Sequence, residues 1–143
     1  MDLDTGWIMN IIDEVCAEYA VDQDRIYVTG VSMGGHGAWY LAFQHPDRFA
    51  AVAPLCGRVD TAWAETLKQV PAWVFHGSRD RVCPIRYSNG IVEALRAFGA
   101  SVRYTVYTGA GHDIVTRTYR NRELYDWLLQ HHRNDNRQAD HGM

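Results

Sequence analysis

Between residues 25 and 34 the chain reads Arg25-Ile26-Tyr27-Val28-Thr29-Gly30-Val31-Ser32-Met33-Gly34. The first seven residues are rich in β-branched and aromatic side chains, which favours a strand. Apolar residues then recur at helical spacing until the chain reaches His45-Pro46: Ala38, Trp39, Leu41, Ala42 and Phe43. The stretch therefore predicts a strand, a tight turn at Ser32 and a helix.

The turn carries the pattern G-x-S-x-G, with Gly30 and Gly34 two positions either side of Ser32. A serine on so sharp a turn needs neighbours without side chains, because a Cβ would clash there. The following helix directs its first N–H groups toward the serine, where negative charge would develop during acyl transfer. We therefore predict that Ser32 is a nucleophile. The alternative is a glycine-rich turn that holds an incidental serine.

The rest of the chain alternates strand and helix patterns. Strands are predicted at 25–31, 49–55, 71–75 and 101–107, and helices at 5–20 (with Thr5 as N-cap), after Ser32, at 61–68, at 88–98 and after Ile114. Alternation without hairpin signals predicts parallel pairing with right-handed crossovers. The expected fold class is α/β, with three layers and a parallel sheet of about four strands between flanking helices.

Length and composition indicate one folded domain. The chain has 143 residues, of which 47% are hydrophobic and 22% charged, so it has material for a core. We expect one domain over 1–132 and a disordered tail over 133–143, where almost nothing can be buried.

Charge and hydropathy exclude several kinds of partner. The formal net charge of −3 comes without a basic cluster, so we expect no nucleic-acid partner. No stretch approaches about 18 consecutive apolar residues, and the acidic start lacks a signal peptide's basic region. We therefore expect no membrane span and favour a cytoplasmic location.

A serine nucleophile needs a general base, and that base needs an orienting carboxylate. We assign the base to His112, in a glycine-rich loop just after the last predicted strand, because parallel sheets gather functional groups at their carboxyl ends. The other histidines are assigned to helix surfaces, to the tail or, for His76, to a buried hydrogen-bonding role. The carboxylate is assigned to Asp80, and Asp60 is the alternative. Asp113 is not chosen, because the side chains of adjacent residues on an extended backbone diverge and Asp113 would be poorly placed to hold the His112 ring.

The three cysteines, Cys16, Cys56 and Cys83, lie at wide and irregular spacing. This spacing predicts neither a disulfide framework nor a zinc site. All three are interpreted as small buried hydrophobic residues, with Cys83 of interest because it follows Asp80.

Several longer phrases resemble the α/β-hydrolase superfamily, near its phospholipase/carboxylesterase and dienelactone hydrolase groups. They are the phrase around Ser32, His45-Pro46-Asp47-Arg48-Phe49-Ala50-Ala51-Val52, Phe75-His76-Gly77-Ser78-Arg79-Asp80 and Gly109-Ala110-Gly111-His112-Asp113. The resemblance implies Ser32 as nucleophile, Asp80 as acid, His112 as base and the backbone N–H of Met33 as an oxyanion donor. It implies no metal or organic cofactor.

The resemblance covers only the second half of that fold. Its members have about eight strands, and the loop that supplies their second oxyanion donor has no counterpart in this sequence. We therefore expect the strand at 25–31 to lie at an exposed edge, and a homo-oligomer in which a second copy covers the surface of the absent half.

Three functions follow as hypotheses. The leading one is a serine carboxylesterase that cleaves a small-molecule ester through an acyl-enzyme on Ser32. The second is a peptidase of prolyl-oligopeptidase type, which shares the fold and the three residues. The third is a non-catalytic half-domain that serves as an interaction module.

Overall fold

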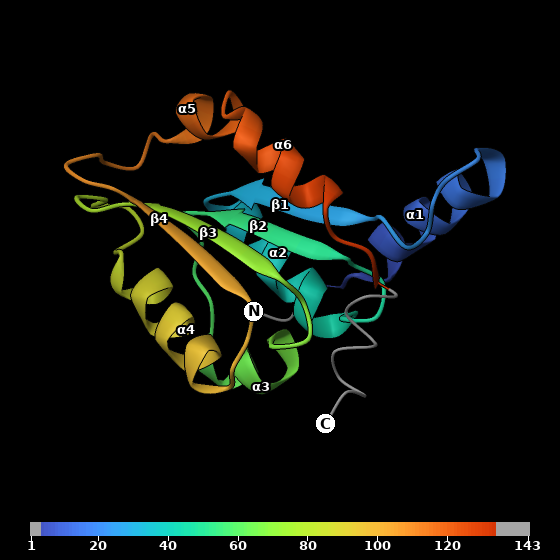
Figure 1. Ribbon diagram of the computed structural model, residues 1–143, viewed down its shortest axis with the longest axis horizontal. Coiled ribbons are helices and arrows are strands. Elements are labelled where there is room, and N and C mark those ends of the chain that lie inside the picture. The colour runs from blue at the N-terminus through green and yellow to red at the C-terminus, as the bar shows by residue number, and fades with distance from the viewer. Residues whose placement is uncertain (1–3, 134–143) are drawn as a thin grey trace.

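The computed structural model describes residues 4–133, and within them a parallel sheet has the strand order β1-β2-β3-β4 (Figure 1). The strands are β1 (Tyr27–Val31), β2 (Ala51–Leu55), β3 (Ala72–Gly77) and β4 (Val102–Tyr107). The helical segments are α1 (Gly6–Glu18), α2 (Met33–Gln44), the 3-10 turn η1 (Thr61–Trp63), α3 (Ala64–Leu67), α4 (Arg86–Ala97), α5 (Val115–Tyr119) and α6 (Arg122–Leu129). The parallel α/β prediction is confirmed.

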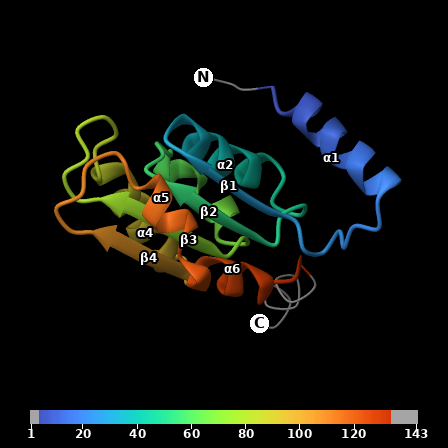
Figure 2. The same ribbon diagram turned by 90° about the horizontal axis from the view of Figure 1, so that it is seen from above.

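Two layers of helices cover the two faces of the sheet (Figures 1 and 2). Side chains alternate along β3, because successive residues of a strand point to opposite faces. Ala72 and Val74 belong to the core beneath α2, α3 and α4. Trp73 and Phe75 belong to the core beneath α5 and α6. The central strands are therefore buried on both faces, which explains their continuous apolar runs and is the arrangement of a three-layer fold.

Parallel pairing brings the carboxyl ends of all four strands to one edge. Val31 pairs with Leu55 in the neighbouring strand, and Gly77 pairs with Tyr107. The loops that follow these residues therefore begin side by side. This edge is where the predicted functional residues lie.

The geometry of the turn between β1 and α2 requires glycine at position 30 of the G-x-S-x-G pattern but not at position 34. A Cβ on Gly30 would lie 2.1 Å from the carbonyl oxygen of Gly34, so only glycine fits there. A Cβ on Gly34 would meet nothing within 4 Å. The expected requirement for a glycine at position 34 is therefore wrong, because the close approach involves its backbone and not its Cβ.

The first helix forms as predicted, but it lies away from the body of the molecule (Figures 1 and 2). Met9 is buried, whereas an apolar stripe at spacings of four residues is exposed: Trp7, Ile11, Val15 and Tyr19. Cys16 on the same helix is only partly buried, which corrects the expectation for this cysteine. Thr5 stands at the N-cap position without capping, because its hydroxyl pairs instead with His45 Nε2 at 3.0 Å.

The last predicted helix is two helices, α5 and α6, with α6 beginning after Asn121. The Asn121 side chain accepts a hydrogen bond from the Glu123 N–H and so caps α6. Arg133, the first residue of the predicted tail, donates its backbone N–H to the Asp24 carbonyl. The remainder of that tail lies outside the described residues. Across residues 4–133, every helix is too short or too polar to cross a bilayer.

Candidate active site

Ser32 lies between the end of β1 and the start of α2, with φ 57° and ψ −112°. A positive φ is uncommon for a residue with a side chain and marks local strain. The turn is held by the Ser32 N–H, which donates to the Leu55 carbonyl at 2.9 Å, and by the His36 N–H, which donates to the Ser32 carbonyl at 3.0 Å. The strain and these two bonds fix the hydroxyl at the carboxyl edge of the sheet.

The structure brings together the three residues predicted for the site. His112 Nε2 lies 2.9 Å from Ser32 Oγ, and His112 Nδ1 lies 2.7 Å from Asp80 Oδ2. A carboxylate only accepts, so Nδ1 carries the proton and Nε2 presents a lone pair to the serine hydroxyl. The hydroxyl therefore donates to a nitrogen that is positioned to take its proton.

Asp80 is buried, and both of its oxygens are engaged. Oδ1 accepts from the N–H groups of Val82 and Cys83, each at 2.9 Å, while Oδ2 faces His112. Burial by itself would raise the pKa of Asp80. The hydrogen bonds from Cys83, His112 and Val82 outweigh burial and hold that pKa below its ordinary value of 3.8. Asp80 is therefore an ionised group with a fixed orientation.

Beneath Asp80 lies His76, whose side chain is fully buried as predicted. Its Nε2 donates to the Cys83 carbonyl at 2.7 Å, and its Nδ1 accepts from the Ser88 hydroxyl at 2.6 Å. Burial is the main reason that the pKa of His76 is lowered from its ordinary value of 6.5. His76 is thus a neutral residue that braces the loop carrying Asp80.

The loop that carries His112 is anchored on the end of β3. The Arg79 N–H donates to the Ala110 carbonyl at 2.9 Å, and the Gly109 N–H donates to Ser78 Oγ at 2.7 Å. A Cβ on Gly77 would lie 2.2 Å from the Gly111 carbonyl oxygen, so the two backbones meet only because residue 77 is glycine. This contact positions the loop so that His112 can reach Ser32.

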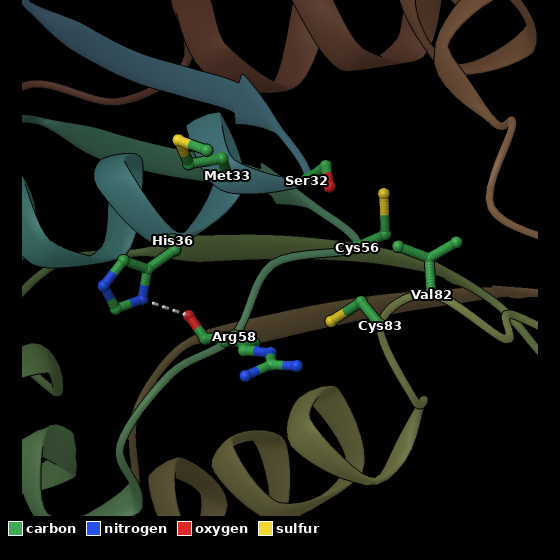
Figure 3. Close-up of a pocket in the computed structure, with 7 residues that line it drawn as sticks. All are labelled: Ser32, Met33, His36, Cys56, Arg58, Val82 and Cys83. Carbon is green, nitrogen blue, oxygen red and sulfur yellow. Dashed lines mark hydrogen bonds between the residues drawn. The ribbon is translucent and has the colours of Figure 1, made fainter. Parts of the chain in front are cut away.

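A pocket of about 490 Å³ opens beside Ser32, and Figure 3 shows its lining residues. It is lined by Ser32, Met33, His36, Cys56, Arg58, Val82 and Cys83. Met33 is 84% exposed at its mouth. His36, which was assigned to a helix surface, is part of the wall, because its Nδ1–H donates to the Arg58 carbonyl at 2.8 Å. No motif in the sequence signals this bond across 22 residues.

Cys56 is the residue of this edge that sequence reasoning missed. It follows β2 with φ 41°, and its side chain is buried as predicted. Its thiol donates a long hydrogen bond, 3.8 Å, to the His112 carbonyl. Burial raises the pKa of this thiol to about 11. Its position could have been inferred from the topology, because Cys56 directly follows β2 just as Ser32 directly follows β1, and parallel strands end at the same edge of the sheet.

The alternatives for the acid and the base lie elsewhere. Asp60 caps η1 by accepting from the Ala62 N–H, and Asp113 is exposed. His131, just after α6, pairs through Nδ1 with the Trp127 carbonyl. His45 pairs with Thr5. The hydrogen-bonded chain of Ser32, His112 and Asp80 is the arrangement that can deprotonate a hydroxyl and stabilise the imidazolium formed.

The chain is similar in sequence to proteins that are named as esterases. The chain is 32% identical over 93 residues to the bifunctional acetylxylan esterase/xylanase XynS20E of Neocallimastix patriciarum, a match covering 65% of this chain and 14% of that protein. It is 31% identical over 98 residues to feruloyl esterase B of Piromyces equi, covering 65% of this chain and 18% of that protein.

Among solved structures, a thermostable esterase superposes with a TM-score of 0.85 at 37% identity. The superposition covers 88% of this chain and 36% of the esterase, so the chain spans about a third of that protein. Residues 8–139 match the Dienelactone hydrolase family. The match extends over most of the 143 residues, and the chain therefore belongs to the dienelactone hydrolase family.

Proposed function

We propose that the chain is a serine hydrolase that cleaves carboxylic esters. The observation that carries this proposal is the pair of hydrogen bonds made by His112, 2.9 Å to Ser32 Oγ and 2.7 Å to Asp80 Oδ2. The esterase relatives, at 31–37% identity, support the same reaction class. Ser32, His112 and Asp80 form a catalytic triad in this proposal, and the turn at Ser32 is its nucleophile elbow.

The first half of the reaction forms an acyl-enzyme. Ser32 Oγ attacks the ester carbonyl while its proton moves to His112 Nε2, giving a tetrahedral intermediate. The Met33 N–H, at the start of α2, donates to the developing oxyanion, aided by the positive end of that helix. His112 then gives its proton to the leaving alkoxide, and the carbon–oxygen bond to the alcohol breaks.

The second half returns the enzyme to its starting state. A water molecule gives its proton to His112 and attacks the acyl carbonyl, and the acid leaves as Ser32 takes the proton back. Asp80 remains ionised throughout, because its hydrogen bonds favour the carboxylate. Its role is to hold Nδ1–H so that Nε2 always faces the serine.

An ester is the expected substrate rather than an amide. An alkoxide departs without the full protonation that an amine leaving group requires, so a site with one assigned oxyanion donor suits the easier leaving group. Removing a single such donor costs other serine hydrolases about 10² to 10³ in turnover. The pocket beside Ser32 would hold one side of the ester.

Kinetics with paired substrates test the proposal. We expect the wild-type chain to hydrolyse a short-acyl p-nitrophenyl ester faster than a proline p-nitroanilide, and Ser32→Ala to abolish both reactions. The matched control is Ser101→Ala, since Ser101 is exposed after α4, and it should retain wild-type turnover. Faster cleavage of the anilide would favour a peptidase. Equal ester hydrolysis by wild type and Ser32→Ala would refute the mechanism.

A further inference from the structure

Three potential metal-binding side chains converge at the carboxyl edge of the sheet. Cys56, Asp80 and His112 follow the adjacent strands β2, β3 and β4. Each offers one ligand atom, and the three atoms lie within 4.8 Å of one another. A thiolate, a carboxylate oxygen and an imidazole nitrogen are the donor types that Zn²⁺ takes in proteins. The wide spacing of these residues in the sequence gave no indication of the cluster.

Cys56 has no part in the proposed hydrolysis, and it lies where the core containing Trp73 and Phe75 meets the carboxyl edge of the sheet. Its side chain is 1% exposed, and its backbone lies in the left-handed region, with φ 41°. The hydrogen bond that its thiol donates is long, at 3.8 Å. In Figure 3 the sulfur points to the side of the pocket where the Ser32 hydroxyl lies. The sulfur is within 4.8 Å of the candidate ligand atoms of Asp80 and His112, which is close enough for it to act as a third ligand atom after a small movement.

The distances suit a tetrahedral site after a small movement. Zn–S bonds of 2.3 Å and Zn–N or Zn–O bonds of 2.0–2.2 Å place ligand atoms roughly 3.3–3.6 Å apart. Asp80 is fixed through Oδ1 by the N–H groups of Val82 and Cys83, so a cation at Oδ2 would replace the hydrogen bond from His112 Nδ1 at 2.7 Å. The His112 side chain is 29% exposed, and to bind a cation it would give up its hydrogen bond to Asp80 or to Ser32. Cys56 lines the pocket beside Ser32, so the pocket offers a cation a path to the thiol.

We propose that Cys56, Asp80 and His112 form an inhibitory binding site for a thiophilic divalent cation such as Zn²⁺. Binding releases the thiol proton to solvent and joins the thiolate, a carboxylate oxygen and one ring nitrogen to the metal. In neutral imidazole one nitrogen bears the proton and the other holds the lone pair. Whichever nitrogen binds the cation, His112 keeps no lone pair for the Ser32 hydroxyl, and hydrolysis stops.

Metal binding itself is tested by spectroscopy, without any assay of activity. Titration of the wild-type chain with Co²⁺ should give a thiolate-to-cobalt charge-transfer band in the near ultraviolet, which added Zn²⁺ removes by displacement. Cys56→Ser should abolish the band and weaken Zn²⁺ binding by at least about the 10- to 100-fold typical of losing an outer-shell partner. Circular dichroism of each variant establishes that it is folded.

The matched control is Cys83→Ser. Cys83 is another buried cysteine of the same pocket wall and is outside the three-residue cluster, so this variant should keep the cobalt band. Absence of the band in the wild-type chain, or its survival in folded Cys56→Ser, would overturn the proposal.

The inhibitory consequence rests on the proposed function, whereas the binding does not. Ester hydrolysis by the wild-type chain should fall with added Zn²⁺ and recover with a chelator. The activity of Cys56→Ser, measured relative to that variant without metal, should need at least tenfold more Zn²⁺ for half inhibition. A chain that binds Co²⁺ through Cys56 without hydrolysing esters would refute the hydrolase proposal alone. Hydrolysis with no cobalt band would refute the metal site alone.

Discussion

His112 Nε2 lies 2.9 Å from Ser32 Oγ, although 80 residues separate them in sequence. The contact follows from the parallel sheet, in which Ser32 comes directly after β1 and His112 lies in the loop after β4. Two intervening strands separate β1 from β4, so the His112 loop must reach back across the carboxyl edge. The backbone contact at Gly77 directs it there.

Replacing Asp80 by Asn should reduce turnover about 10⁴-fold, the loss typical when a triad carboxylate becomes an amide. The Asn carbonyl would keep the Oδ1 position, because Val82 and Cys83 donate N–H groups to it. The amide NH₂ would then face His112 Nδ1, which forces the proton onto Nε2, the wrong tautomer to accept from Ser32. Steady-state hydrolysis of a p-nitrophenyl ester measures this effect.

Asp113→Asn is the matched control for that substitution, since Asp113 is exposed beside His112. It should keep turnover within a few-fold of wild type. An Asp80→Asn chain with more than a tenth of wild-type activity would mean that Asp80 does not set the tautomer.

Gly30→Ala should destabilise the chain severely, whereas Gly37→Ala should stabilise it. The new Cβ at position 30 would lie 2.1 Å from the Gly34 carbonyl oxygen and would force the turn at Ser32 apart. At position 37, inside α2, a Cβ meets nothing within 4 Å, and Ala is favoured over Gly in a helix by roughly 0.5–1 kcal/mol. Urea denaturation of the two variants gives the comparison. Equal stability of Gly30→Ala and wild type would contradict the close approach described for the turn.

Stability should fall as the pH drops from 7 to 5. The pKa of His76 is lowered in the folded chain from its ordinary value of 6.5, so below about pH 6.5 the unfolded chain binds a proton that the folded chain resists. The contribution of Asp80 persists through this window, because its folded pKa lies below 3.8, and is lost only as the pH falls through that lower value. Thermal melts between pH 7.5 and 5 test the slope, which should be shallower in His76→Asn. A melting temperature that rises toward pH 5 would contradict this account.

Self-association remains a prediction for this chain. β1 ends the described sheet with one unpaired edge, and α1 exposes the stripe of Trp7, Ile11, Val15 and Tyr19. A second copy is the occupant we expect, because it brings an identical edge and stripe that can pair about a two-fold axis. Sedimentation at micromolar concentration should show a dimer or larger species, weakened by Ile11→Glu and retained in Phe98→Glu, which alters an exposed residue outside the stripe. A wild-type monomer of 16.3 kDa would contradict the prediction.

The sequence was most informative where a local pattern has a single physical meaning. The uncharged run before Cys56 predicts a strand buried on both faces, which β2 is. The G-x-S-x-G turn and the loops after β3 and β4 indicated Ser32, Asp80 and His112 because parallel strands end together. The positions of these three residues could therefore be predicted without a tertiary structure.

Features that depend on tertiary contacts could not be predicted in the same way. The apolar periodicity of α1 indicated a helix but not that its apolar stripe would be exposed. Periodicity alone does not show which surface, if any, packs against a helix. The contacts of Cys56 and His36 join segments that carry no common motif. The break between α5 and α6 had a readable signal, because Asn121 followed by Arg122-Glu123 is a capping sequence.

Covalent labelling is the most direct test of the central claim, that Ser32 is a nucleophile activated by His112 and Asp80. The folded chain is treated with a fluorophosphonate and the modified peptide is identified by mass spectrometry. We predict one adduct, on Ser32, that forms slowly or not at all in His112→Ala and Asp80→Asn and normally in Ser101→Ala. An unlabelled wild-type chain, or an adduct that persists undiminished in Ser32→Ala, would contradict the account.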